Sequence, residues 1–388
     1  MEIDYISGPK TDKIFGMTKY ELEIIKRIDI NFNIIHYNSL MKYFEKNYAK
    51  NLTPKTYSPK TEKGVKTENR SNFLMEMGKN TLRFIDKQLY IRTVKNKVKK
   101  GNIKHITSQE YAYLLNSVKL ENNMVTCYDL IPWVYDNNRS SLWKQNMNGL
   151  KQAETIITIS EFSRDEIVKY LDYPKEMIEI VYPAVDHTNY NPTDDKKILL
   201  KLNIPTDQKV VLYVGSEVPR QNVPVLIKAF ALLKKKIPDI KLVKIGDPQS
   251  YGARESVLQL INELELSDDV IFAGYVPEED MPKWYNAADI LVYPCDYAGF
   301  GLPPLEAMAC GTPVITSNTT SLPEVVGDAG IMINPQDFEL MAAKMYDVLT
   351  DNKLKDKMIN NGLRRSKLFN WDDSARKTLE IYKNNSNL

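Results

Sequence analysis

The sequence contains few residues that bind metals or form disulfides, and this shortage excludes several classes of protein. Only three cysteines occur among 388 residues, and they lie far apart, at Cys127, Cys295 and Cys310. An odd number of widely spaced cysteines is typical of reduced thiols in the cytoplasm rather than of a disulfide framework. The histidines, His36, His105 and His187, have no metal-ligand spacing, and no Asp-x-Asp pair occurs. We therefore expect no dedicated metal site.

Long apolar segments are also missing. No run of about 18 apolar residues occurs, so we expect no membrane-spanning helix. Residues 1–20 carry charges without an apolar block, which is unlike a secretion signal. The composition is 43% hydrophobic and 26% charged, with a formal net charge of +2. A chain of this length and composition predicts a globular cytoplasmic protein of two or three domains.

One basic stretch departs from this balanced composition. Between Lys79 and Lys104 the only acid is Asp86, and the cations are Lys79, Arg83, Lys87, Arg92, Lys95, Lys97, Lys99, Lys100 and Lys104. The simpler interpretation is a solvated helix surface. The alternative is a peripheral contact with anionic lipid at the inner face of a membrane, or with a phosphorylated acceptor. No nucleic-acid-binding motif accompanies the stretch, so no nucleic acid partner is expected. Residues 47–72, rich in Lys, Thr, Pro and Asn, predict a loop.

The second half of the sequence alternates short β-branched runs with amphipathic segments. Strands are predicted at residues 209–214, 241–245, 270–273, 290–293 and 313–316, and helices at residues 223–235, 255–264, 281–287 and 304–309. Strands that alternate with helices indicate a parallel sheet with helices on both faces. Ligands of such domains bind at the carboxyl ends of the strands.

The first half is less regular. Its predicted strands are residues 34–37, 124–127, 155–159 and 179–182, and Ser160 can cap a helix that begins near Ser163. Residues 186–195 are polar and contain proline, which predicts an interdomain linker. We therefore place one α/β domain at residues 1–187 and a second at residues 188–369. The terminal helix, residues 370–388, is expected to pack back on the first domain.

The segment from Tyr293 to Thr316 carries the strongest chemical signal. It reads Y-P-C-D-Y-A-G-F-G-L-P-P-L-E-A-M-A-C-G-T-P-V-I-T. Gly299 and Gly301 leave main-chain amides accessible, and the prolines that follow suit a first helical turn. Free amides and the helix dipole there favour a diphosphate. Glu306 is expected in the first turn of that helix, and a carboxylate there can accept two hydrogen bonds from a ribose diol. The alternative is a tight strand-to-helix turn without a ligand.

This segment resembles the signature of the family-four glycosyltransferases, which are retaining enzymes of the GT-B fold that use nucleotide sugars. Other segments that resemble the family, in the same order, are residues 16–20 (G-M-T-K-Y), 157–163, 180–186, 215–230, 272–277 and 322–335. The resemblance is strong from about residue 124 to the end. It implies two Rossmann-like, doubly wound domains that face a central cleft, with a nucleotide sugar as substrate and neither metal nor cofactor.

The resemblance also implies the residues of the site. The donor-binding residues would be Gly16, Ser216, Arg220, Gln221, Tyr275, Val276, Ala298, Gly299, Phe300, Gly301, Leu302 and Glu306, with backbone groups near Tyr275 and Val276 at the nucleobase. The catalytic residues would be Tyr128, Asp129 and Arg220. A loop-capping role is the alternative for Asp129, and burial in the cleft wall is the alternative for Tyr128.

Three positions depart from the family. Ala298 replaces a usual glutamate, Gln221 a usual lysine and Tyr128 a usual histidine. Two hypotheses follow. The first is an active, metal-independent, retaining hexosyltransferase whose acceptor is a glycan or a lipid-linked glycan in glycolipid or surface polysaccharide assembly. The second is a catalytically degenerate homologue that binds a nucleotide sugar or a partner protein. A dinucleotide oxidoreductase is disfavoured, because no Gly-x-Gly-x-x-Gly follows the first strand.

Overall fold

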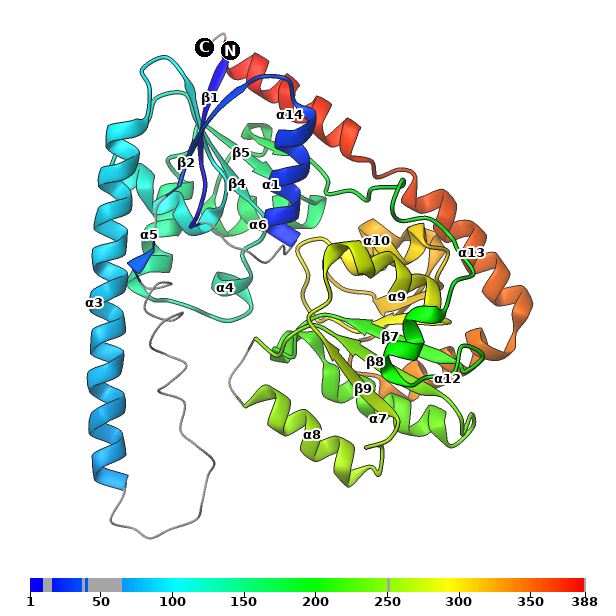
Figure 1. Cartoon of the computed structure of the whole chain (residues 1–388). Coiled ribbons are helices and arrows are strands. Elements are labelled where there is room, and N and C mark those ends of the chain that lie inside the picture. The colour runs from blue at the N-terminus through cyan, green and yellow to red at the C-terminus, as the bar shows by residue number, and fades with distance from the viewer. Residues whose placement is uncertain (10–15, 37–38, 41–64, 250–251, 387–388) are drawn as a thin grey trace.

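The computed structural model describes residues 1–9, 16–36, 39–40, 65–249 and 252–386. It contains two six-stranded sheets in which all pairs of neighbouring strands are parallel. The two sheets belong to separate lobes of the molecule (Figure 1). The expected α/β fold of two Rossmann-like domains is therefore confirmed.

The first sheet has the strand order β2-β1-β3-β4-β5-β6. Its strands are β1 (Glu2–Ile6), β2 (Asn31–Ile35), β3 (Ile103–Ile106), β4 (Asn123–Cys127), β5 (Thr155–Thr158) and β6 (Ile178–Ile180). The associated helices are α1 (Gly16–Arg27), α3 (Val65–Lys97), α4 (Ile131–Val134), α5 (Ser141–Leu150) and α6 (Glu161–Leu171), with 3₁₀ helices η2 (Gln109–Asn116) and η3 (Lys175–Met177). As the sequence predicted, Ser160 caps α6, because its side chain accepts a hydrogen bond from the amide of Ser163.

The second sheet has the strand order β12-β11-β10-β7-β8-β9. Its strands are β7 (Val210–Val214), β8 (Lys241–Ile245), β9 (Val270–Gly274), β10 (Ile290–Tyr293), β11 (Val314–Ser317) and β12 (Ile331–Ile333). The helices are α7 (Val223–Lys234), α8 (Ala253–Glu263), α9 (Met281–Ala287), α10 (Leu302–Ala309), α11 (Leu322–Val326), α12 (Phe338–Thr350) and α13 (Asn352–Ser366), with 3₁₀ helices η4 (Lys197–Leu202), η5 (Pro219–Gln221), η6 (Glu278–Asp280) and η7 (Gly327–Ala329). The predicted strands and helices of this half are confirmed to within a few residues.

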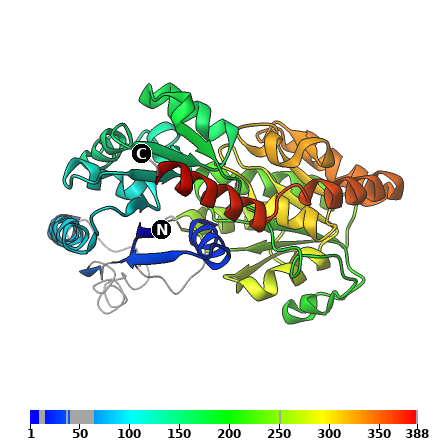
Figure 2. The same cartoon turned by 90° about the horizontal axis from the view of Figure 1, so that it is seen from above.

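The last helix, α14 (Trp371–Asn385), returns to the first domain. Figure 2 shows α13 and α14 running across the molecule from the second lobe to the first. Helix α14 packs against α1, and the hydroxyl of Tyr382 lies 2.6 Å from Nδ1 of His105 in β3. The first domain thus includes β1 and packs against α14, the first strand and the last helix of the described residues.

Two expectations for the region around α3 need correction. Residues 65–72 were predicted to be loop, but they form the first turns of α3, whereas residues 47–64 lie outside the described residues. Lys104 does not belong to a basic helix surface, because α3 ends at Lys97 and Lys104 is buried in β3. Membrane contact through the rest of the stretch stays a prediction. None of the helices in the described part of the chain combines the length and apolar character needed to cross a bilayer.

Candidate active site

The turn that precedes α10 presents unpaired main-chain amides. Gly301, with φ of +119°, caps α10 at its N-terminus in a conformation that favours glycine. The hydroxyl of Ser321 lies 2.8 Å from each of the carbonyl oxygens of Ala298 and Phe300. Hydrogen bonding to these carbonyl oxygens stabilises the turn and does not involve its amides. No described residue accepts a hydrogen bond from the amides of Gly299, Phe300 or Gly301. These amides are therefore available to an anion at the positive end of the α10 dipole.

A second helix begins opposite this turn. Gly16 is the first residue of α1, and a Cβ atom added to it would lie 3.5 Å from Cδ1 of Leu302, the first residue of α10. The N-terminal ends of α1 and α10 therefore face each other across the domain boundary. Two helix N-termini that converge in this way reinforce each other's attraction for a negatively charged group.

The first domain covers the glycine turn in this conformation. A Cβ atom on Gly299 would lie 2.9 Å from the carbonyl oxygen of Tyr128 and 3.0 Å from Cβ of Asp129, so a larger residue would collide with the first domain. The hydroxyl of Ser160 donates a hydrogen bond of 2.8 Å to the carbonyl oxygen of Gly299. Glycine at position 299 is thus explained by close approach of the two domains.

Glu306 lies at the centre of a buried polar cluster. Its Oε1 atom is 2.6 Å from Nζ of Lys19, and its Oε2 atom accepts a hydrogen bond of 2.8 Å from the hydroxyl of Tyr285. Lys19 also forms an ion pair with Glu278, whose carboxylate accepts a hydrogen bond of 2.6 Å from Tyr190. Burial opposes the charge of Lys19, but the two carboxylates outweigh burial and raise the pKa of Lys19.

Sequence reasoning missed the partners of Glu306. Lys19 is in α1 and reaches Glu306 in α10, so this ion pair joins the two domains. A signal was present in the segment G-M-T-K-Y, because Lys19 lies about one helical turn after Gly16. The sequence around Tyr285 and Glu278, by contrast, gives no sign of a role in the site. Only the fold brings these two residues to the cluster.

Arg220 and Asp129 occupy opposite sides of the domain boundary. Arg220 lies in η5, and its Nη1 donates a hydrogen bond of 3.0 Å to the carbonyl oxygen of Tyr297. Asp129 accepts a hydrogen bond of 3.0 Å from the amide of Ile131, which is the loop-capping contact considered as the alternative. Burial raises the pKa of Asp129, while the Ile131 amide and the positive charge of Arg220 partly oppose this effect. Asp129 lies against Gly299, and Arg220 lies against Tyr297 at the start of the same turn.

Three of the other predicted residues are held by protein contacts. The ring of Tyr128 packs edge-on against Tyr20, and its buried hydroxyl has no hydrogen-bond partner among the described residues. The hydroxyl of Tyr213 lies 3.0 Å from Oε1 of Gln221 and 2.8 Å from the carbonyl oxygen of Ser216. The Tyr213 contacts hold Gln221 and Ser216 at the end of β7. Tyr128 is buried in the hydrophobic core.

The remaining predicted residues divide into two groups. Ala298 and Phe300 are buried in the turn itself, and the amide of Ala298 donates a hydrogen bond of 3.2 Å to the hydroxyl of Thr320. Tyr275 and Val276 follow β9, at the edge of the second sheet, whereas the glycine turn follows β10. Strands β7 and β8 separate the two groups, so a ligand that contacts both must extend along the carboxyl edge of the sheet.

Comparison with known proteins identifies related sequences. The family model described as glycosyl transferases group 1 matches residues 194–365. The O-antigen chain mannosyltransferase B of Escherichia coli is 35% identical over 277 residues, which cover 68% of this chain and 71% of that protein. The serotype-specific mannosyltransferase WbdA of Escherichia coli is 29% identical over 66% of this chain, but the match covers only 32% of WbdA.

Solved structures share the architecture across both domains. The crystal structure of HepE from Anabaena in complex with UDP and glucose superposes with a TM-score of 0.74 and 17% identity, and the match covers 98% of this chain and 99% of that one. Sucrose-phosphate synthase from Thermosynechococcus elongatus gives a TM-score of 0.72 with 21% identity, and the match covers 98% of each chain. At these identities the likeness establishes the two-domain fold alone.

Proposed function

Because this chain belongs to the glycosyl transferases of group 1, the family-four enzymes of the GT-B fold, we propose that it transfers a hexosyl unit from a nucleotide sugar to a hydroxyl group of a glycan, with retention at the anomeric carbon. Mannosyltransferases among its relatives support a role in the assembly of a surface polysaccharide. The observation that carries the proposal is the convergence of the α1 and α10 N-termini at three amides for which no described residue is an acceptor.

The donor diphosphate would bind between these two helix N-termini. Amides that are already oriented cost no reorganisation when charge develops on the leaving group, and Arg220 adds a permanent positive charge nearby. This arrangement supplies what a divalent cation would otherwise supply, so we propose a reaction without metal. The glycine turn is covered by the first domain, so the donor would enter when the two domains separate and would be enclosed when they close.

The nucleoside would extend from the diphosphate along the carboxyl edge of the second sheet. A carboxylate offers about four lone-pair sites, of which Lys19 and Tyr285 use one on each oxygen of Glu306. Two sites therefore remain for the ribose diol, and Lys19 would orient the carboxylate. The base would lie toward Tyr275 and Val276, which follow β9.

The proposed step exchanges two bonds to the anomeric carbon. The bond to the diphosphate oxygen breaks, and a bond to the acceptor oxygen forms on the same face of the sugar. The acceptor proton passes to the departing phosphate oxygen, so no separate base is required. Asp129 would accept a hydrogen bond from a sugar hydroxyl, since it lies beside Gly299 and within the electrostatic influence of Arg220.

Substitution of Arg220 tests this proposal. A thermal-shift panel of UDP-, GDP- and ADP-sugars would first identify the donor, and ligand at about 100 times its dissociation constant should stabilise the fold by about 2.7 kcal/mol. With that donor and a glycan acceptor, Arg220→Ala should lower kcat by roughly 100- to 1,000-fold, because an oriented group at developing charge is lost. Arg376→Ala, on the exposed surface of α14, is the matched control.

The outcomes of these experiments distinguish between the two hypotheses that the sequence suggested. Donor binding, with product formation that Arg220→Ala slows roughly 100- to 1,000-fold, supports the transferase. Donor binding without product for any acceptor would favour the catalytically degenerate homologue. If no nucleotide sugar shifts the melting curve, the donor site proposed here is wrong.

A further inference from the structure

The carbonyl groups of the glycine turn contact serine hydroxyls from both domains. Ser321, in the second domain, lies 2.8 Å from the carbonyl oxygens of both Ala298 and Phe300. Ser160, at the start of α6 in the first domain, donates a hydrogen bond of 2.8 Å to the carbonyl oxygen of Gly299, which lies between them. The middle carbonyl group of the turn is therefore held from across the domain boundary.

These contacts fix the direction of the amides in the turn. In a planar trans peptide unit the carbonyl group and the amide of the next residue point in opposite directions, and no cis peptide bond occurs among the described residues. The carbonyl group that Ser160 holds shares its peptide unit with the amide of Phe300. The two that Ser321 holds share theirs with the amides of Gly299 and Gly301. Ser160 thus directs one of the three amides that the proposed function assigns to the diphosphate.

Glu324 attaches the helix that carries Ser160 to the second domain. Its carboxylate, in α11, accepts hydrogen bonds from the amide of Glu161 at 2.8 and 3.0 Å and from the amide of Phe162 at 3.4 Å. The hydroxyl of Tyr182, also in the first domain, donates a hydrogen bond of 2.8 Å to the same carboxylate. The two amides form the N-terminus of α6, where the helix dipole attracts a negative charge. The start of α6 is therefore held against α11.

The residues around this contact connect it to the glycine turn. Arg365, in α13, donates hydrogen bonds to the carbonyl oxygens of Glu324 at 2.5 Å and Val325 at 3.0 Å, and so fixes the backbone of α11. The ring of Tyr182 packs against that of Phe300 with 6.2 Å between their centroids. The carboxylate that holds α6 and the turn that α6 contacts are therefore parts of one interface.

We propose that Ser160 and Glu324 are positioning residues for the transfer, and that they complete the diphosphate site only when the two domains are closed. Ser160 directs the amide of Phe300, and Glu324 acts through Ser160 by holding α6 against the turn. When the domains separate, the Gly299 carbonyl group loses its hydroxyl partner and the Phe300 amide loses its fixed direction. The inference rests on the proposed transferase function and adds a link between domain closure and stabilisation of the leaving group.

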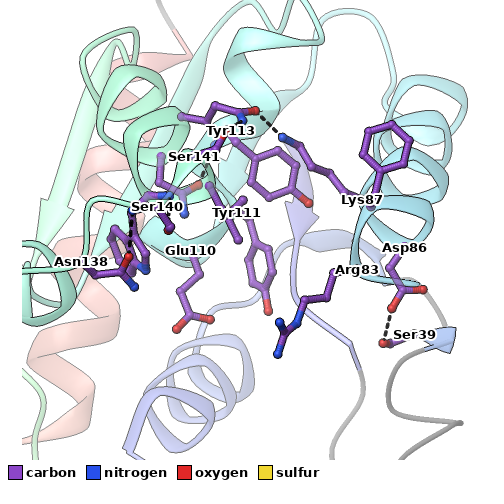
Figure 3. A pocket seen from close by; sticks show the side chains of 15 residues that line it. Ser39, Arg83, Asp86, Lys87, Glu110, Tyr111, Tyr113, Asn138, Ser140 and Ser141 are labelled. Atoms are coloured by element: carbon purple, nitrogen blue, oxygen red, sulfur yellow. Dashed lines mark hydrogen bonds between the residues drawn. The ribbon is translucent and has the colours of Figure 1, made fainter. Parts of the chain in front are cut away.

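A second capping serine of the first domain provides a matched control. Ser140 caps α5, and its hydroxyl oxygen accepts a hydrogen bond of 3.4 Å from the amide of Trp143. It lies on the wall of a cavity of about 950 Å³ between α3, η2 and α5 (Figure 3), and no described residue of the second domain forms a hydrogen bond with it. Ser140→Ala removes a helix cap alone, whereas Ser160→Ala removes a cap and the contact with Gly299.

Isothermal titration calorimetry of the full chain tests the inference, with UDP, GDP, ADP and the corresponding monophosphates as probes. For the diphosphate that binds the parent protein, Ser160→Ala and Glu324→Ala should each weaken binding about tenfold, which corresponds to about 1.4 kcal/mol. The monophosphate presents less charge to the amides and should lose less affinity. Ser140→Ala should bind both probes as the parent protein does. Glu324→Gln keeps an acceptor oxygen and should lose less than Glu324→Ala.

The double variant Ser160→Ala/Glu324→Ala tests whether Glu324 acts through Ser160. It should bind the diphosphate no more weakly than the single variant with the larger loss, because residues that act on one amide are not additive. Additive losses would overturn the inference. So would equal losses for the diphosphate and the monophosphate, which would indicate a structural role alone, or parent-like diphosphate binding by both single variants.

The melting temperature of each variant checks that it is folded. Because Glu324 is only partly buried, its two variants keep the test decisive if Ser160→Ala does not fold. Failure of the proposed function is distinguishable from failure of this inference. If no diphosphate binds the parent protein, both are wrong, whereas binding that is unaffected by Ser160→Ala and Glu324→Ala contradicts the positioning role alone.

Discussion

The two sheets have the same number of parallel strands but are built from different residues. In the second domain, the strands next to the glycine turn are almost wholly apolar, as in β7 (V-V-L-Y-V) and β10 (I-L-V-Y). In the first domain, β1 carries Asp4 and β3 carries Lys104 and His105, and all three are buried. A central strand buried on both faces normally reads as an apolar run. Strands β7 and β10 follow that rule, whereas β1 and β3 in the first domain, and β8 with its buried Lys244 in the second, depart from it.

The buried polar groups of the first sheet are satisfied from distant parts of the chain. Nε2 of His105 lies 2.7 Å from the hydroxyl of Thr126, and its Nδ1 contacts Tyr382 near the end of the chain. Asp4 accepts hydrogen bonds from Asn33 and Asn102. The comparison shows that the two strands beside the glycine turn are specified mainly by local pattern, whereas β1 and β3 depend on tertiary partners. Three experiments can break or sharpen this contrast.

The largest expected effect concerns Lys19, which joins the two domains. Lys19→Ala should lower the free energy of unfolding by about 3–5 kcal/mol, because it leaves the buried carboxylate of Glu306 without its cation. Urea unfolding followed by tryptophan fluorescence measures the change. Lys26→Ala, an exposed lysine of the same helix, should change stability by less than about 0.5 kcal/mol. Equal stability of the two variants would mean that the domains do not stabilise each other through this contact.

Glu21, which is half-buried in the first domain, and Glu217, which is buried in the second, are expected to respond differently to pH. Burial raises the pKa of Glu21 in the first domain to about 7, although it accepts a hydrogen bond of 2.8 Å from Ser7. In the second domain burial opposes the charge of Glu217, but Arg254 and Lys244 outweigh it and lower its pKa. The folded state therefore binds a proton at Glu21 that the unfolded state has already released above pH about 4.5. The contribution of Glu21 to stability is lost as pH rises from about 4.5 through about 7.

Glu21→Gln should remove the loss of stability that deprotonation of Glu21 causes as pH rises. Relative to the parent protein, the variant should gain up to about 3 kcal/mol of unfolding free energy between pH 5 and pH 8, as a pKa difference of about 2.5 converts at about 1.36 kcal/mol per unit. Unfolding curves across that range measure the difference. Glu255→Gln, at an exposed position of α8, serves as the control and should show no such gain. A gain that is independent of pH would show that titration of Glu21 is not its cause.

The smallest expected effect concerns the return of α14. Tyr382→Phe should lower the free energy of unfolding by about 1–2 kcal/mol, because Nδ1 of the buried His105 loses its hydrogen-bond partner. Burial lowers the pKa of His105 to about 3, so the ring stays neutral and needs a partner for each nitrogen. Tyr346→Phe in α12 is the control, since no described residue is a hydrogen-bond partner of the Tyr346 hydroxyl. A cost no greater than that of the control would mean that the first sheet does not depend on this contact.

The candidate site could be predicted in part. The spacing of Gly299 and Gly301 identified the turn and the helix after β10, because glycine at an N-cap has a local physical cause. The expected place of Glu306 in the first helical turn was wrong, because α10 begins at Leu302 and has no acid in its first turn. The partners of Glu306 were not predictable, since Lys19 lies 287 positions earlier in the chain and local periodicity does not report such contacts. The departures at Tyr128, Gln221 and Ala298 were visible in the sequence, but their contacts with Tyr20, Tyr213 and Thr320 required the fold.

The sequence by itself determined the alternation of strands and helices in the second domain, the glycine turn and the family. These features follow from hydrophobic periodicity and backbone conformation, which act over a few residues. Only the tertiary structure decided that α1 and α10 begin face to face, that Lys19 reaches Glu306 and that α3, η2 and α5 enclose a cavity. Each of these joins residues far apart in the chain, and their positions depend on how the two sheets and the returning helix pack together.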